Sequence, residues 1–260
     1  MKILTNTFCN YCLEEADKKG IEYDYDYNKT NLVELNEVGL YHFTCPQNHV
    51  QWMIVQEQLF QILFDLGVLA VCDSYTREAV SSFASSLERF YEFIIKFILL
   101  SEDIKEEIID EFWKQISKQS ERQFGAFLSL YSNKFRKVPS IPSTEWVKFR
   151  NDVTHNGIIP NESKTLEYGQ LVSDLIFDIL FDLKEHYKGE INLQFFKVYD
   201  YNRKKIKEKY PNIGKVSGGS FPSIIQLRAI QSPEFVRIKL EDQIIKYRNS
   251  TKFIKISYVK

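Results

Sequence analysis

Apolar side chains recur at helical spacing through the middle of this chain. From Trp52 to Val71 they stand at positions 52, 55, 59, 62, 63, 66 and 69, and from Thr76 to Leu100 at positions 80, 83, 84, 87, 90, 91, 94, 95 and 98. Residues three or four apart share one face of an α-helix, so each stretch predicts a helix. The broader second stripe is typical of a helix that packs against several others.

Helical periodicity continues beyond this point with one clear interruption. A third helix is expected over residues 101–131, and the two prolines of residues 137–142 then break the pattern. A short helix over Thr144–Asn156 and a last long helix over residues 161–185 follow. Residues 52–189 are therefore expected to form an antiparallel helical bundle.

The two ends of the chain show other patterns. Near the N-terminus, Ile21–Asn28 and Leu32–Thr44 are rich in Tyr, Val and Leu and predict short strands. Residues 190–260 predict a mixed α/β extension, with a strand at Asn192–Tyr201, a Gly/Ser loop at Lys215–Ser220, a helix from Ser232 to Arg248 and a final strand at Lys252–Val259. Within the expected helix, positions 236, 238 and 240 also alternate like a strand. The predicted fold class is mainly α, with a small β unit before the bundle and this extension after it.

The composition narrows the class of protein. Of the 260 residues, 44% are hydrophobic and 27% are charged, which is ordinary for a globular protein and excludes a disordered chain. The best apolar run, Phe93–Leu100, contains Lys96 and is far shorter than the ~18–20 residues of a membrane span. The N-terminus lacks the apolar run of a signal peptide. We therefore expect a cytoplasmic protein without a membrane partner.

The net charge of −1 conceals an asymmetry. Residues 190–260 hold 15 Lys and Arg against six Asp and Glu, whereas the preceding residues hold 19 against 29. A basic tail on an acidic body suggests an anionic partner or self-association, and a solvated tail that maintains solubility is the alternative. The candidate substrate-binding residues in this tail form a basic cluster of Arg203, Lys204, Lys205 and Lys207.

Three of the four cysteines form two short spacings with a histidine. Cys9 and Cys12 make a C-x2-C pair, and Cys45 and His49 make a C-x3-H pair. Three thiolates and one imidazole are the ligands of a tetrahedral structural Zn²⁺, and in a cytoplasmic protein this pattern favours a metal over a disulfide. Two such knuckles around short strands resemble a zinc ribbon, which we expect over residues 1–51.

Other assignments of these residues stay open. His42 is a substitute ligand for His49, although its spacing fits neither pair. Cys72 stands alone and is expected to be a small core residue. The alternative to a metal centre is a set of reduced structural cysteines beside an incidental histidine.

The short helix over Thr144–Asn156 carries the strongest catalytic pattern. Asn151 and His155 are four residues apart and share a helix face. His155 lies in the last turn, where the helix dipole favours the imidazolium form, and Arg150 offers a planar cation suited to phosphate oxygens. A cation and a proton carrier are what cleavage of RNA by its own 2′-OH requires. No P-loop, dinucleotide-binding or serine-esterase motif is present.

Arg150-Asn151-x3-His155 resembles the active-site signature of the HEPN-domain ribonucleases, in which Arg and a polar residue precede a His at the end of a bundle helix. The resemblance covers about residues 56–188. It implies a metal-independent endoribonuclease that builds one site from Arg150, Asn151 and His155 of both chains of a homodimer. It also implies a bacterial toxin or an antiviral defence effector, with RNA as substrate and an antitoxin or another regulatory protein as partner.

Two further interpretations accompany this one. Glu88, on the preceding long helix, is a candidate to orient His155, although a solvated helix face also explains it. If the motif is structural, His155 caps its helix and Arg150 pairs with Glu145 or Asp152. The alternative function is a non-catalytic module that binds nucleic acid or protein and dimerises through the bundle.

Overall fold

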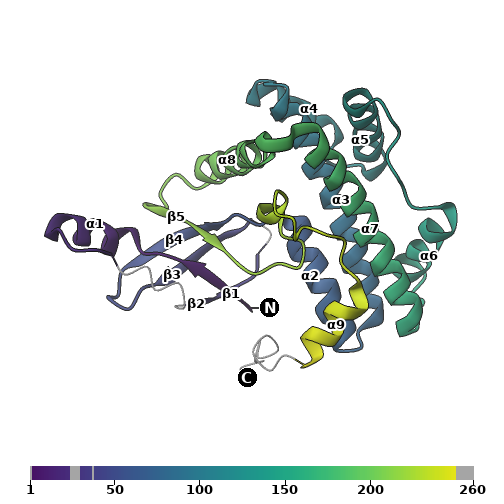
Figure 1. Cartoon of the computed structure of the whole chain (residues 1–260), viewed down its shortest axis with the longest axis horizontal. Helices are drawn as coiled ribbons and strands as arrows, with labels where there is room; N and C mark the ends of the chain where they lie inside the picture. The colour runs from purple at the N-terminus through teal and green to yellow at the C-terminus, as the bar shows by residue number, and fades with distance from the viewer. Residues whose placement is uncertain (1, 24–29, 37, 250–260) are drawn as a thin grey trace. The chain divides into compact units, whose positions relative to one another are not determined.

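The structure, a computed structural model, describes residues 2–23, 30–36 and 38–249. The chain is mainly helical with one small sheet, as the hydrophobic pattern predicts (Figure 1). It divides into two compact units. Among the described residues, the sheet unit consists of those before Leu59 together with Tyr199–Pro222, and the helical unit consists of Leu59–Val198 and residues 223–249.

This division differs from the expected one of 1–51, 52–189 and 190–260. Residues 190–260 contribute to both units, because their strand completes the sheet while a later helix packs on the bundle. In the described part of the chain, no helix has an apolar stretch long enough to cross a bilayer.

Within the described residues, the sheet unit is built on five strands, ordered β2-β1-β5-β4-β3. They are β1 (Lys2–Thr7), β2 (Thr30–Glu34), β3 (Leu40–Thr44), β4 (Val50–Val55) and β5 (Val216–Ser220), and the helix α1 (Asn10–Lys19) follows β1. The pair β4–β5 is parallel and the other neighbouring pairs are antiparallel. The segment expected to form one strand at Leu32–Thr44 thus contains parts of two, and most of Ile21–Asn28 lies outside the described residues.

The prediction of a Gly/Ser loop at Lys215–Ser220 is wrong, because Val216–Ser220 form the central strand β5. Thr7 of β1 donates its hydroxyl to the carbonyl of Gly218 at 3.0 Å, and the N–H of Gln56 donates to Gly219 at 3.0 Å. A Cβ on Gly218 would lie 3.3 Å from the Gln56 amide, so a small residue suits this crowded position. Glycine usually weakens a strand, but at this position it fits because it has no side chain.

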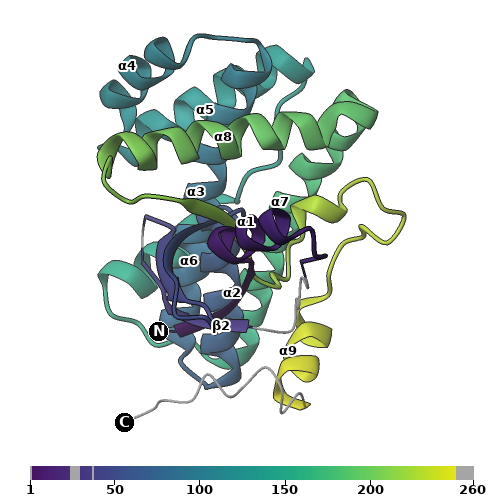
Figure 2. The same cartoon turned by 90° about the vertical axis from the view of Figure 1, so that its left-hand side faces the viewer.

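The helical unit contains the remaining helices. They are α2 (Leu59–Cys72), α3 (Thr76–Ser101), α4 (Glu106–Ile116), α5 (Ser120–Phe135), α6 (Thr144–His155), α7 (Glu162–Tyr187), the first part of α8 (Ile191–Lys209) and α9 (Leu240–Asn249), with short 3-10 turns at Lys188–Glu190 and Leu227–Ala229. α3 lies in the middle, against α2, α5, α6 and α7 (Figures 1 and 2).

The expected helices at 76–100, 144–156 and 161–185 are confirmed with small shifts of their ends, and the other expectations need correction. Trp52 lies in β4 rather than in the first helix. Two apolar positions, 52 and 55, are too few to distinguish the helical period of about 3.6 residues from the strand period of two. The third helix is divided into α4 and α5 by a turn at residues 117–119.

The strand expected at Asn192–Tyr201 is also wrong, because this segment belongs to α8. Ile191, Val198 and Tyr201 are buried, and their spacings of seven and three residues match a helix. The helix expected from Ser232 begins only at Leu240, and the strand expected at Lys252–Val259 lies outside the described residues.

Two glycines allow α2 and α7 to approach α3 closely. A Cβ on Gly67 of α2 would lie 2.5 Å from the ring of Phe83, and a Cβ on Gly169 of α7 would lie 2.6 Å from the same ring. Phe83 is fully buried, so its ring has no free space into which to move. The core of the helical unit therefore requires the absence of a side chain on both sides of Phe83.

We expect Gly67→Ala to destabilise the protein by about 1–3 kcal/mol through overpacking against Phe83. The matched control is Gly125→Ala in α5, where an added Cβ meets nothing within 4 Å. That change should stabilise the helix by up to about 1 kcal/mol, because alanine has the better helix propensity. Thermal unfolding measures both variants, and a Gly67→Ala protein as stable as the control would contradict this packing.

Candidate functional site

The four predicted metal ligands come together at one end of the sheet unit. Cys9 precedes α1 and Cys12 lies in its first turn, whereas Cys45 and His49 flank the turn between β3 and β4. Their ligand atoms all lie within 4.8 Å of one another, so the cluster could hold a metal ion. The prediction that these two pairs meet is confirmed.

Distances within the cluster suit tetrahedral coordination. The Cys12 and Cys45 sulfurs are 3.7 Å apart, and His49 Nδ1 lies 3.7 Å from Cys9 Sγ and 3.3 Å from Cys12 Sγ. Zinc–sulfur bonds of about 2.3 Å at tetrahedral angles place two sulfurs about 3.8 Å apart. Nδ1 of His49 is therefore the nitrogen that faces the prospective metal.

The two halves of the cluster are held by different local structures. Asn48 adopts a left-handed conformation at φ 61°, which Asn tolerates well, and its N–H donates to the Cys45 carbonyl at 2.8 Å. Buried Gln51 holds the other half, because it donates to the Phe8 carbonyl at 2.9 Å and accepts from the N–H of Asn10 at 3.0 Å. The first pair thus begins a helix, unlike the strand knuckle that the sequence suggested.

The pKa values of Cys12 and Cys45 are shifted in opposite directions. Burial and the neighbouring Cys9 and Cys45 thiols raise the pKa of Cys12 to about 12. Burial also opposes ionisation of Cys45, but backbone N–H groups of His49 and Gln47 donate to its sulfur and lower its pKa below the usual value. Three ionised sulfurs at these distances would repel one another, and a bound cation would neutralise that repulsion.

Sequence reasoning missed a carboxylate beside the cluster. Glu15, one turn after Cys12 on α1, places its carboxylate 3.6 Å from His49 Nε2, the ring nitrogen opposite Nδ1. A carboxylate in this position fixes the tautomer and the orientation of a metal-binding histidine. The i, i+3 spacing of Cys12 and Glu15 was visible in the sequence, but no signal there connected Glu15 to His49. His42 lies outside the cluster, on the exposed face of β3, and its ring centroid is 5.6 Å from that of Trp52.

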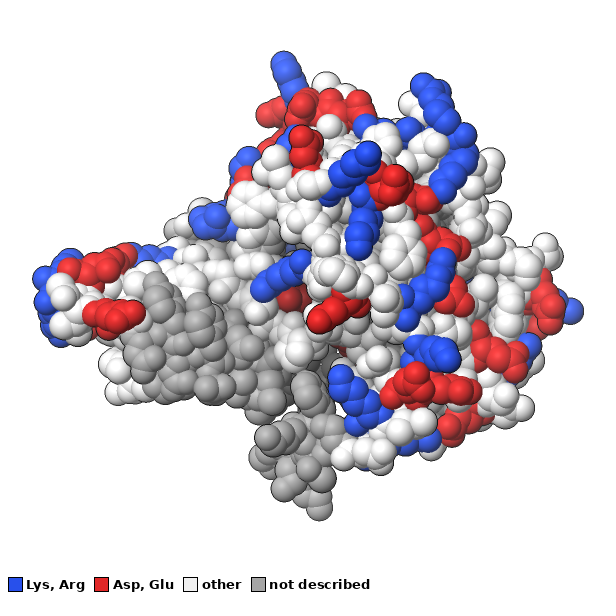
Figure 3. Space-filling view, viewed as in Figure 1, with Lys and Arg blue, Asp and Glu red and all other residues white. Residues whose placement is uncertain are grey.

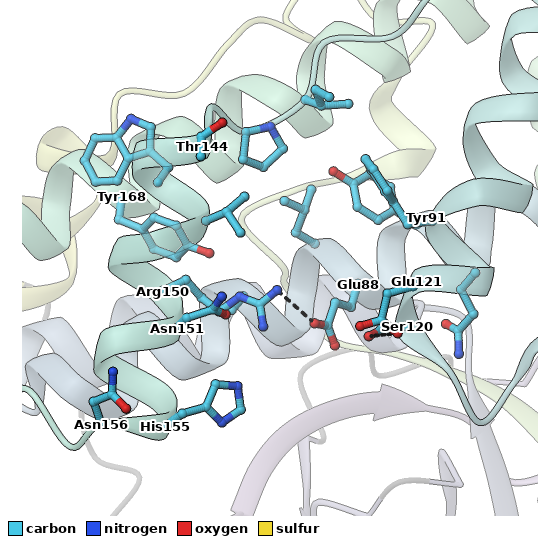
Figure 4. A pocket seen from close by; sticks show the side chains of 18 residues that line it. Glu88, Tyr91, Ser120, Glu121, Thr144, Arg150, Asn151, His155, Asn156 and Tyr168 are labelled. Carbon is cyan, nitrogen blue, oxygen red and sulfur yellow. Dashed lines mark hydrogen bonds and ion pairs between the residues drawn. The ribbon is translucent and has the colours of Figure 1, made fainter.

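A second site lies in the helical unit. A cavity of about 870 Å³ is bounded by α3, α5, α6 and α7 (Figure 4). Arg150, Asn151 and His155 all line it, and so do Leu87, Glu88, Tyr91, Phe124, Trp146 and Tyr168. The structure therefore brings the three predicted catalytic residues to one cavity, which also contains Glu88.

The local structure of α6 explains this placement. Val153 is fully buried, and Trp146 and Phe149 pack against Tyr168 of α7 with ring centroids 5.8 and 5.6 Å apart. The helix ends at His155, since Gly157 adopts φ 72° and the N–H of Asn156 closes the last turn on Asp152 at 3.1 Å. His155 consequently stands exposed at the end of a firmly packed helix.

Arg150 is held by a partner on another helix. Its Nη2 lies 3.7 Å from Glu88 Oε1 of α3 (Figure 4), and each side chain is about one-third exposed. Among the residues that the structure describes, Glu88 is the ion-pair partner of Arg150, and Glu145 and Asp152 are not. This pairing differs from both sequence interpretations, because among the described residues Glu88 pairs with Arg150 rather than with His155. The interaction aims the guanidinium across the cavity.

Tyrosine hydroxyls on the same cavity were missed by sequence reasoning. Burial raises the pKa of Tyr168 well above its ordinary value, with Arg150 opposing the shift and Glu88 adding to it. Burial, together with Tyr168 and Glu88, likewise raises the pKa of Tyr91. Both groups therefore remain neutral phenols that can donate a hydrogen bond. In the sequence both tyrosines were ordinary members of apolar helix faces.

The basic cluster of the tail lies on α8, in the part that belongs to the sheet unit. Two of its members form ion pairs within the helix. Lys204 Nζ lies 3.1 Å from Asp200 Oδ2, and Lys205 Nζ lies 3.1 Å from Glu208 Oε2. In the described ranges no ion pair involves Arg203 or Lys207. On the face drawn in Figure 3, Lys and Arg lie interspersed with Asp and Glu. The tail charge is thus partly neutralised.

Comparisons with known proteins leave the chain without an assigned family. No family model, no curated protein and no solved structure matches it.

Proposed function

We propose that the helical unit is a metal-independent endoribonuclease whose active site contains Arg150, Asn151 and His155. The observation that carries the proposal is that these three side chains line one cavity, in which Arg150 pairs with Glu88. The cavity's volume lies in the range of ligand-binding pockets. A guanidinium, an amide and an imidazole at one cavity suit a phosphodiester better than a neutral ligand.

The proposed reaction is attack of a ribose 2′-oxygen on the adjacent phosphorus. The P–O5′ bond breaks, the 2′-hydroxyl loses its proton, and the leaving 5′-oxygen gains one. The products are a 2′,3′-cyclic phosphate and a 5′-hydroxyl. Arg150 would stabilise the charge that develops on the phosphoryl oxygens, so no divalent ion is required. His155 would transfer a proton, and Asn151 would position the phosphate.

In-line attack needs a base and an acid on opposite sides of phosphorus, which favours a site shared by two chains. Exposed apolar side chains beside the motif support a homodimer through this end of α6. Ile158 and Ile159, which follow His155 closely in the chain, are 49% and 78% exposed. Burial of such groups against a second copy is a common driving force for dimer formation.

We propose Zn²⁺ as the metal of the Cys9, Cys12, Cys45 and His49 cluster. Three sulfurs and one nitrogen in a tetrahedral arrangement are a donor set typical of structural zinc, and they leave no position open for catalysis. Cys9 and Cys45 also belong to the apolar core of the sheet unit, beside Val33, Phe43 and Met53. The metal's proposed role is therefore to stabilise a unit whose core is small.

The biological role is proposed on the HEPN resemblance alone. A ribonuclease of this kind would act as a bacterial toxin or an antiviral defence effector, with its RNA substrate cut only when a regulatory protein releases it. A non-catalytic binding module remains the alternative, and the next experiment separates the two.

His155→Ala should lower the rate of RNA cleavage by at least ~10²-fold, the usual contribution of general acid–base catalysis. The matched control is His186→Ala, because His186 is also an exposed histidine near the end of a helix but does not line the cavity. Cleavage of labelled RNA without added metal measures both, and the ends should be 2′,3′-cyclic phosphate and 5′-hydroxyl.

Arg150 provides a second test of the same chemistry. Arg150→Ala should be as damaging as His155→Ala, and Arg150→Lys should restore only part of the activity, since an ammonium lacks the bidentate fork. Full activity in His155→Ala, or equal cutting of RNA and DNA of the same sequence, would exclude the proposal. Absence of cleavage by the wild-type dimer would favour the binding module.

Purified protein should contain about one zinc per chain, as measured by elemental analysis of protein prepared without chelator. Cys45→Ala should lose the metal and lower the thermal stability of the sheet unit, because a structural zinc contributes directly to folding. Cys72→Ala is the matched control, since Cys72 lies outside the cluster. Metal-free wild-type protein, or equal metal content in both variants, would refute the assignment.

Glu15→Gln should keep the zinc but weaken its binding by about 10–100-fold, the usual effect of losing a carboxylate behind a ligating histidine. Competition with a coloured chelator measures this affinity. Glu14→Gln is the neighbouring control, because Glu14 pairs with Lys215 rather than with His49. Equal affinities in the two variants would show that Glu15 does not support His49.

The basic cluster on α8 should bind RNA mainly through its unpaired members. The double variant Arg203→Gln/Lys207→Gln should weaken binding and reduce its salt dependence more than Lys204→Gln/Lys205→Gln, whose lysines are already paired with acidic residues. Titration of RNA at several salt concentrations measures both slopes. If the two double variants bind equally well, the cluster does not contact RNA in this way.

A further inference from the structure

The cavity contains a buried hydroxyl without a partner. Tyr91 of α3 is 7% exposed, and its hydroxyl has no hydrogen-bonding partner among the residues that the structure describes. Its ring is fixed by Phe127 and Phe124, with centroids 4.4 and 5.4 Å away. The hydroxyl points into the cavity (Figure 4). An unsatisfied buried hydroxyl is costly for stability, and a ligand in this cavity could supply the missing partner.

The surroundings of this hydroxyl have the character of a site for a flat aromatic ligand. Phe124, Trp146 and Tyr168 contribute aromatic rings to the cavity wall, and Leu87 adds apolar surface. Arg150 and His155 occupy the same cavity (Figure 4). One cavity thus combines aromatic surface, the unpartnered hydroxyl of Tyr91 and a cation suited to phosphate.

We propose that this cavity is a nucleobase subsite, in which an unstacked base of single-stranded RNA packs among the aromatic side chains and hydrogen-bonds to the Tyr91 hydroxyl. The inference rests on the proposed ribonuclease function and names the feature of the substrate that the site would select. The base would be the one next to the phosphate held by Arg150.

Three properties favour a base over other parts of RNA. Aromatic side chains stack on every base but offer little to ribose or phosphate. A phenol hydroxyl can both donate and accept, so it can read one polar atom on a base edge. Bases are free to enter such a cavity only where the strand is unpaired, which makes single-stranded RNA the substrate class.

The test is the binding of the four nucleoside 3′-monophosphates to three proteins: the wild type, Tyr91→Phe and Tyr75→Phe. We expect the wild type to prefer one or two of the nucleotides. Tyr91→Phe should bind the preferred nucleotide about fivefold to tenfold more weakly, the effect of losing one neutral hydrogen bond. Tyr75→Phe, an exposed tyrosine outside the cavity, should behave like the wild type.

Thermal stability provides a second measurement. Because Tyr91→Phe removes an unsatisfied hydroxyl and keeps the ring, it should be at least as stable as the wild type. A loss of stability would show that the hydroxyl has a structural partner and would overturn the proposal. Unchanged base preference in Tyr91→Phe, or failure of every nucleotide to bind the wild type, would overturn it as well.

This experiment separates failure of the subsite from failure of the ribonuclease. If base preference depends on Tyr91 but no RNA is cut, the subsite stands and the proposed reaction is wrong. If RNA is cut and Tyr91→Phe cuts at the same bases as the wild type, the ribonuclease stands and the subsite is wrong.

Discussion

β5 is the constraint on which the sheet unit depends. It lies between β1 and β4, so without it the β1–β2 and β3–β4 pairs would have no common neighbour. The hydroxyls of Thr7 and Ser217 meet at 3.0 Å although 210 positions separate them in the chain. The Cys9–Cys12 pair follows β1 and the Cys45–His49 pair joins β3 to β4. A metal ion at the cluster would therefore link the two halves of the sheet that β5 also joins.

The helical unit positions its cavity by a different means. α3 is central, and close packing of Phe83 against Gly67 and Gly169 fixes two of its neighbours. The proposed catalytic residues Arg150, Asn151 and His155 lie at the edge of this rigid core, where their charges can remain partly solvated. Arg150 and Glu88 come from different helices, so their pairing relates α6 directly to α3. Rigid helices are better supports than loops for groups that must be placed accurately.

Stability and function place opposite demands on the cavity. A core of this aromatic content would be most stable with no polar group left unpaired. Tyr91 departs from that rule, and it does so on the cavity that also contains the α6 motif. Local departures of this kind are expected where a protein binds a ligand, because the ligand supplies the missing interactions. The same reasoning applies to the clustered thiols, whose ionisation a metal ion would favour.

The sequence by itself determined the features that depend on local spacing. Helical periodicity predicted α3, α6 and α7, and two short spacings predicted the Cys3His cluster, because neighbours along a helix or turn are neighbours in space. Tertiary structure decided the rest. The glycines of β5 are typical of a loop. The segment is a strand because it pairs with β1 and β4, which are more than 160 positions away in the chain. The pairings of Glu15 with His49 and of Glu88 with Arg150 join separate elements, so no local pattern could reveal them.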